Sequence, residues 1–463
     1  MKRYITYAVL IFYICLNNTE IVLAQETGKN VPGHPQNETT SPNEDELPLV
    51  DDFPLEEDLP LDEESLELES LDDMLPLTTE VNLTFTGQGR LINDDSRLNP
   101  DNTIQDLEEG EGTFETHLMV SDYLNEKQTL RWLFKGYGFY SSETNDNDER
   151  LNVTRIDEVF ADWKGGDGFL SLGKRRINWG HAMSFNPVNV VVPPRDPLNP
   201  NQETEGHPVV WLNFSRNFGS LDLFFTRDFD KDWHSDLNRW GARLGLLLGE
   251  FDFSFYYFDS EPYQDDRDYE RMFGGSFSTN LSAGITLYSE VAGFNHNYRQ
   301  YYDSESTGIL KDEFYVQGVV GSYIILDPES FLSFFNGDAG LTLEAYYNGG
   351  GYSQSERKNY FDALDQALQQ GNPSVLGDYR FTGMNQFYGL FIYRNSFKER
   401  YTTELSGLIA QDTSFSAQLQ LTYNLSDYYS IKTKYTHNQG GNDTEFGNAP
   451  VSDQFEAMFD IHF

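Results

Sequence analysis

Hydrophobic and polar residues alternate with a period of two over most of the chain. Val81, Leu83 and Phe85 fall on one face of a segment whose intervening residues are polar. The same alternation runs through residues 415–423 and 455–463. A period of two with one apolar face is typical of half-buried β-strands. The pattern therefore predicts an all-β chain.

Counting these segments gives about 18 strands. Most run roughly 9–13 residues, which is long for strands of soluble domains (about 5–6) but right for tilted strands that span a membrane. The predicted strands are 79–92, 113–122, 127–141, 151–164, 168–178, 207–216, 220–228, 238–248, 250–260, 271–280, 283–294, 313–327, 337–349, 384–396, 400–411, 413–424, 427–438 and 454–463.

The links between predicted strands alternate in length. Links after odd-numbered strands are mostly long, as at 179–206 and 350–383, and those after even-numbered strands are mostly short. A tight link at 411–413 and a longer one at 328–336 break the rule. Short turns at one end and long loops at the other are typical of membrane barrels. We therefore expect residues 78–463 to form an antiparallel, up-and-down transmembrane β-barrel of about 18 strands (16–18).

The N-terminus reads as a secretory signal peptide, residues 1–24. Lys2 and Arg3 precede an apolar stretch at 4–16, and small residues allow cleavage after Ala24. A membrane anchor is the alternative, but about 13 apolar residues fall short of the roughly 20 needed to span.

Residues 25–77 form an acidic tail. Positions 41–73 hold fifteen acids, four prolines and no Lys or Arg. Mutual repulsion and proline predict a disordered segment, placed in the periplasm if the barrel is bacterial. The alternative is a partner-binding tail in which 65–74 forms an amphipathic helix.

Composition excludes several classes of protein. The 463 residues contain 32 Lys+Arg against 75 Asp+Glu, a formal charge of −43, which argues against a nucleic-acid partner. The single cysteine, Cys15, excludes an internal disulfide framework and a multi-cysteine zinc site. No metal and no cofactor are expected. Aromatic residues make up 15% of the chain, so disorder from end to end is also excluded.

The C-terminal strand resembles the last strand of Gram-negative outer-membrane β-barrel proteins. Phe455, Phe459, Ile461 and the terminal Phe463 alternate in the same way. In that group this strand is the signal read by the barrel-assembly machinery. The resemblance implies a location in the bacterial outer membrane, in contact with lipid and lipopolysaccharide.

A second segment is similar to the "G-R-Q-x-x-x-W-G … N-P" stretch of porin-like and alginate-export-like barrels. It comprises Gly173, Trp179, Gly180, Asn186 and Pro187. The resemblance implies a channel for diffusion or export of small hydrophilic solutes or polysaccharide. The alternative is a non-conducting barrel that binds surface polysaccharide or scaffolds an envelope complex.

If the polar faces line a lumen, nine residues are candidates to set its electric field. The alternative is that they pair across strands and only solvate the wall. The excess of acids suggests selectivity for cations. The candidates are Glu158, Asp162, Ser171, Arg175, Asp222, Glu290, Glu344, Glu404 and Lys432.

Two long loops carry structure of their own. Residues 179–206 contain five prolines, which fit either an inward-folded constriction or a rigid cap outside the barrel. Residues 355–370 have helical periodicity. That helix docks on the barrel mouth or enters the pore, or it is a plain surface helix.

Enzyme activity is not expected. Residues 228–232 alternate carboxylates as calcium loops do, but lack the Gly and Glu of an EF-hand. Residues 435–437 resemble the Tyr-Thr-His of outer-membrane phospholipase, yet Gln439 stands where that family has its nucleophilic Ser.

Overall fold

The computed structural model describes most of the chain after residue 77. The predicted signal peptide, the acidic tail and the calcium-like stretch 228–232 lie outside the described residues. The description covers 78–463 apart from 125–126, 128, 145–149, 192–194, 201–203, 228–237, 261–270, 298, 312, 328–336, 380–381 and 399.

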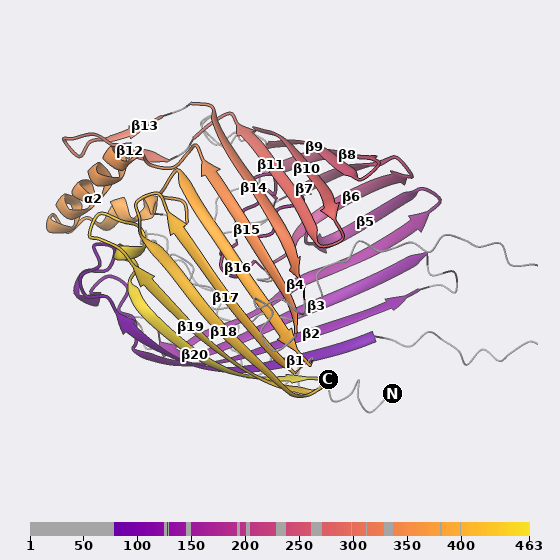
Figure 1. Ribbon diagram of the computed structural model, residues 1–463, viewed down its shortest axis with the longest axis horizontal. Helices are drawn as coiled ribbons and strands as arrows, with labels where there is room; N and C mark the ends of the chain where they lie inside the picture. Colours follow the sequence, from indigo (N-terminus) through magenta and orange to yellow (C-terminus); the bar gives the residue numbers. More distant parts are fainter. Residues whose placement is uncertain are drawn as a thin grey trace, which may run out of the picture.

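The described strands form one closed antiparallel sheet of 18 strands, which confirms the predicted barrel (Figure 1). Consecutive long strands are neighbours, and β1 pairs with β20 to close the sheet. The strands of the barrel are β1 Thr78–Ile92, β2 Gly110–Tyr123, β3 Leu130–Thr144, β4 Arg150–Gly165, β5 Gly168–Arg175, β6 His207–Arg216, β7 Gly219–Arg227, β8 Asn238–Leu248, β9 Phe251–Ser260, β10 Arg271–Ser282, β11 Ile285–Phe294, β14 Tyr315–Leu326, β15 Asp338–Asn348, β16 Phe387–Phe397, β17 Tyr401–Ala410, β18 Phe415–Ser426, β19 Tyr429–Gln439 and β20 Val451–His462.

Two details differ from the predicted pattern. The strand expected to run to residue 178 ends at Arg175, so Ile177 belongs to the following loop. The long link after β11 contains a small hairpin, β12 (Gln300–Tyr302) and β13 (Gly308–Leu310). Strands of three residues are too short to give a readable alternation.

Barrel closure brings the two ends of the described chain together. Val81 and Phe463 exchange two backbone hydrogen bonds, of 3.1 and 2.9 Å. They lie at the short-turn end, whereas helix α2 (Gln354–Gln369) and the long loops lie at the opposite end (Figure 1). We call the latter the loop end. No helix within the described residues is long and apolar enough to cross a membrane.

The outward face of the sheet is apolar and exposed. Large hydrophobic side chains occupy the outward positions on strands all around the barrel. Examples are Phe85, Val159, Leu223, Phe255, Val291, Val320, Leu405, Leu421 and Phe459.

Aromatic side chains gather at both edges of this apolar band. At the short-turn end, Tyr401 stacks on Tyr423 with ring centroids 4.7 Å apart. At the loop end, Trp240 and Phe273 lie on either side of Tyr257, each 5.0 Å from its ring. Paired aromatic belts around an apolar band are the pattern of a barrel in a bilayer.

Candidate functional site: the barrel lumen

The loop between β5 and β6, residues 176–206, folds into the barrel. Near its start Trp179 packs edge-on against Phe224 of β7, with ring centroids 4.9 Å apart. Further along, Phe185 stacks on Tyr346 of β15 at 4.3 Å and joins a cluster that reaches β17. Nine of the eighteen strands run from β7 to β17. The loop therefore covers about half of the inner wall, rather than lying outside the barrel.

Two carboxylates of the wall hold this loop by its backbone. One Glu290 oxygen, from β11, accepts the N–H groups of residues 181 and 182. The two Glu344 oxygens, from β15, accept the N–H groups of residues 183–185 at 2.9–3.1 Å. The Tyr288 hydroxyl also donates to Glu344, at 2.8 Å. Hydrogen bonds to an ionised acceptor are about twice as strong as neutral ones. Five consecutive loop amides are thus satisfied by two side chains.

The motif residues shape the entry into the loop. Gly180 has a φ of +98°, and a Cβ there would overlap the Glu290 carboxylate and the Asn186 amide. Asn186 donates from Nδ2 to the Trp179 carbonyl oxygen at 2.5 Å. Pro187 then leads into the fully buried Val188. These contacts explain locally why a Gly and an Asn stand at these two positions.

Gly173, the first residue of the motif, serves the wall rather than the loop. It lies in β5 with a φ of +136°, and a Cβ there would overlap the Val159 carbonyl oxygen of β4. Only glycine allows this close approach of two backbones. The β5 strand ends two residues later, and the chain turns inward.

Several predicted pore-lining acids form ion pairs within the wall. Three such contacts join an acid to a base of a neighbouring strand, and a fourth involves a base just after β5. The N···O pairs are Arg175–Asp162 at 2.7 Å, Arg176–Glu158 at 2.9 Å, Lys432–Asp460 at 3.3 Å and Arg243–Asp222 at 3.6 Å, and Arg175 also donates to Ser171 at 3.1 Å.

Glu404 lies on the inward face of β17, because Leu405 beside it is exposed and Ser406 is fully buried. Its register partner on β16 is Arg394. The structure therefore brings acids and bases together on this face. Pairing across strands, the alternative drawn from the sequence, describes most of the candidates. Their effect on a permeating solute stays a prediction.

Sequence reasoning found Arg175 and Lys432 but missed the other basic residues of this arrangement. Arg90 pairs with Glu111 across β1 and β2, and Lys434 pairs with Glu456 at 2.6 Å. Arg155 lies beyond a register shift between Lys135 and Gly136. A bulge changes which face a residue occupies, so alternation alone could not place it. The alternation of polar and apolar residues places Arg90 and Lys434 on the inward face, but it does not identify their partners.

The long loops build a cap at the loop end. Helix α2 starts with a capping box between Ser353 and Glu356 and buries Tyr360, Phe361 and Leu364 completely. These side chains pack against the β12–β13 hairpin and the loop after β1. The helix is thus docked on other loops at the barrel mouth. We call α2, the β12–β13 hairpin and loops 93–109 and 440–450 the loop-end cap.

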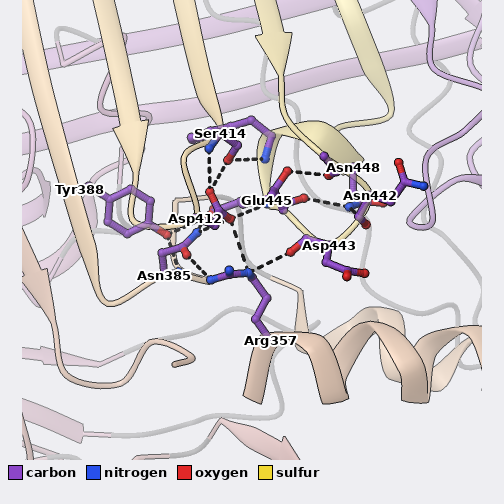
Figure 2. Close-up of polar contacts among 12 residues, drawn as sticks. Arg357, Asn385, Tyr388, Asp412, Ser414, Asn442, Asp443, Glu445 and Asn448 are labelled. Atoms are coloured by element: carbon purple, nitrogen blue, oxygen red, sulfur yellow. Dashed lines mark hydrogen bonds and ion pairs between the residues drawn. The ribbon is translucent and has the colours of Figure 1, made fainter. Parts of the chain in front are cut away.

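A buried polar cluster joins this cap to the barrel (Figure 2). Arg357 of α2 donates to Asn385 Oδ1 at 2.6 Å and to the Asp443 carbonyl oxygen at 3.0 Å. Its Nε lies 3.5 Å from Asp412 Oδ2, in the tight turn after β17. Glu445 accepts from the Tyr388 hydroxyl at 2.6 Å. Four separate segments meet here around one guanidinium and two carboxylates.

The phospholipase-like triplet has an acid beside its histidine. His437 Nδ1 lies 2.8 Å from Asp453 Oδ1, which also accepts the Tyr435 hydroxyl at 2.5 Å. Within the described part of the chain, no group of three or more His, Cys, Asp or Glu side chains is arranged to hold a metal ion.

The closed antiparallel topology, the alternation of loop lengths and the infolded loop define the class of fold. The chain is a porin-like β-barrel.

Comparisons with known proteins find similarity to solved structures of porins and related channels. No protein-family model matches the chain, and no curated protein matches its sequence. Pseudomonas aeruginosa OccK5 (OpdH) aligns with 84% of this chain and 98% of its own, at 12% identity and a TM-score of 0.47. Pseudomonas aeruginosa OpdK with vanillate aligns with 83% of this chain and 98% of its own, at 12% identity and 0.47. A triple mutant of Rhodopseudomonas blastica porin aligns over 84% and 100%, at 9% identity and 0.44. The likeness is one of barrel architecture, and nothing about a substrate follows from it.

Proposed function

We propose that the protein is an outer-membrane channel for small hydrophilic solutes. The observation that carries the proposal is the pair of opposite faces on one sheet. The outward face is apolar and edged by aromatic belts, whereas the inward face holds hydrogen-bonded and ion-paired polar groups. An apolar exterior suits lipid, and a polar interior suits water and solutes.

The infolded loop sets the size of the passage. Residues 181–185 lie against β11 and β15 inside the barrel, so solutes pass between this loop and the opposite wall. That wall, β1–β6 and β18–β20, carries the ion pairs of Arg90, Arg175 and Lys432. A narrowed lumen with paired charges favours neutral or zwitterionic solutes of limited size.

Cation selectivity follows less readily from this arrangement. The excess of acids in the sequence suggested it, but many inward acids have a base as partner, as Asp162 has Arg175. A paired carboxylate contributes a weaker field along the channel than a lone one. We expect only weak selectivity, and the reversal potential of a reconstituted channel measures it.

Swelling of liposomes that contain the purified full-length protein tests the channel function. Sugars of increasing size should enter up to a sharp limit, because the loop restricts the lumen. Entry of long oligosaccharides would indicate a polysaccharide exporter. Binding of a glycan without entry of any solute would contradict the channel and favour the non-conducting alternative.

A further inference from the structure

Glu445 is a carboxylic acid that is completely buried between the cap and the barrel (Figure 2). Its Oε2 accepts from the Tyr388 hydroxyl at 2.6 Å and from Asn385 Nδ2 at 2.7 Å. Its Oε1 is buried and has no hydrogen-bond partner among the described residues. An oxygen in that position is available to carry a proton.

A second buried carboxylate lies beside Glu445. Asp412 Oδ2 accepts the backbone N–H of Glu445 at 2.8 Å and the Asn385 amide at 3.0 Å. The cation that contacts this pair is Arg357 of α2, 3.5 Å from Asp412, and Arg299 of the loop after β11 acts at longer range. The Tyr379 hydroxyl, from the segment after α2, also faces these acids. Two buried carboxylates thus share one close guanidinium, and a second negative charge is costly there.

Glu445 also stands where the cap touches the infolded loop. Phe446, the next residue, belongs to the same buried cluster as Phe185 and Leu198 of that loop. The Tyr388 ring, whose hydroxyl binds Glu445, lies 5.8 Å from the Phe185 ring. On the other side, the cluster reaches α2 through Arg357. A change at Glu445 therefore acts on both segments through direct contacts.

We propose that Glu445 is a proton-binding joint that couples the loop-end cap to the infolded loop, so that loss of its proton loosens both. This coupling is a property separate from solute passage. The current measurement that tests it rests on the proposed channel.

The direction of the pH effect follows from the surroundings of this acid. Burial, reinforced by the Asp412 charge, raises the pKa of Glu445 to about 7. In an unfolded chain the pKa of a Glu side chain is about 4.3. A folded pKa above the unfolded one gives a contribution to stability that is complete below about pH 4.3 and is lost as the pH rises through about 7. The cap is therefore held firmly on the barrel at acidic pH and less firmly at mildly alkaline pH.

Single-channel currents of the full-length protein test the joint, recorded from about pH 5.5 to about pH 8.5. For wild type we expect the frequency of brief closures to change severalfold with a midpoint near the pKa of Glu445. Glu445→Gln, which cannot ionise, should keep the acidic behaviour throughout. Asp443→Asn, which removes a more exposed carboxylate two residues away, should keep the wild-type transition. A transition that persists in Glu445→Gln, or is missing in a wild-type protein that conducts, would overturn the proposal.

Hydrogen exchange provides a readout that needs no current. After correction for the intrinsic pH dependence, α2 and residues 440–450 and 181–185 should exchange faster above the transition in wild type but not in Glu445→Gln. If the barrel conducts nothing, this result still supports the joint, and only the channel proposal fails. Exchange that is equal in the two proteins at every pH would contradict the joint even in a conducting barrel.

Discussion

Buried ion pairs mark the seam where the barrel closes. Lys432 and Asp460 lie 3.3 Å apart with side chains 2% and 3% exposed. Asp460 also accepts from Thr84 on β1 at 2.7 Å and from Ser430 on β19 at 3.1 Å. One carboxylate thus ties together the first strand and the last two. Its role is visible only once the seam is known, because these residues are far apart in sequence.

Replacing Asp460 with Ala should destabilise the barrel by about 3–5 kcal/mol, since it removes a buried carboxylate that pairs with the buried Lys432 ammonium. Asp167→Ala is the matched control, because the Arg216–Asp167 pair is about two-thirds exposed and such pairs contribute about 0–1 kcal/mol. Urea unfolding in detergent measures both variants. Equal losses would show that burial of the pair does not matter.

Gly180 is a second position where a single residue decides the local structure. With its φ of +98° and no space for a Cβ, Gly180→Ala should cost about 1–3 kcal/mol and disturb the start of the infolded loop. Gly389→Ala is the control, because nothing lies within 4 Å of a Cβ there. The same unfolding measurement applies, and a harmless Gly180→Ala would contradict the position given to this loop.

At the scale of elements, the strands and the helix follow from the sequence, but the path of the infolded loop does not. Alternation finds every barrel strand because each has one side toward lipid and one toward the interior. It also extends β5 too far, since Ile177 continues the pattern while packing inside the barrel. Prolines in the loop fit an inward or an outward path equally well. Only the contacts with Glu290 and Glu344 distinguish the two.

Glu344→Gln tests how the loop is held. The amide keeps one acceptor oxygen but turns an N–H₂ group toward loop amides, so the three hydrogen bonds to residues 183–185 weaken. We expect noisier and larger current steps as the loop leaves the wall. Glu404→Gln removes the same charge from the inner face opposite Arg394 and should leave the step size close to wild type. Identical currents in the two variants would mean that charge, not anchoring, matters.

At the scale of the whole molecule, one sheet separates two environments. The formal charge of −43 is compatible with this division. Apolar side chains are needed only on the outer face, and acids on the inner face form ion pairs with basic side chains. The long loops leave this division intact, since they gather at one end and one of them enters the lumen. The proposed channel therefore requires a continuous watery path past that loop.

Single-channel conductance of the purified protein in a planar bilayer tests this path most directly. We predict discrete open steps that are smaller than those of a variant whose loop anchors are removed, Glu290→Gln combined with Glu344→Gln. If correctly folded wild-type protein inserts into the bilayer but carries no current at any voltage, the channel function is contradicted.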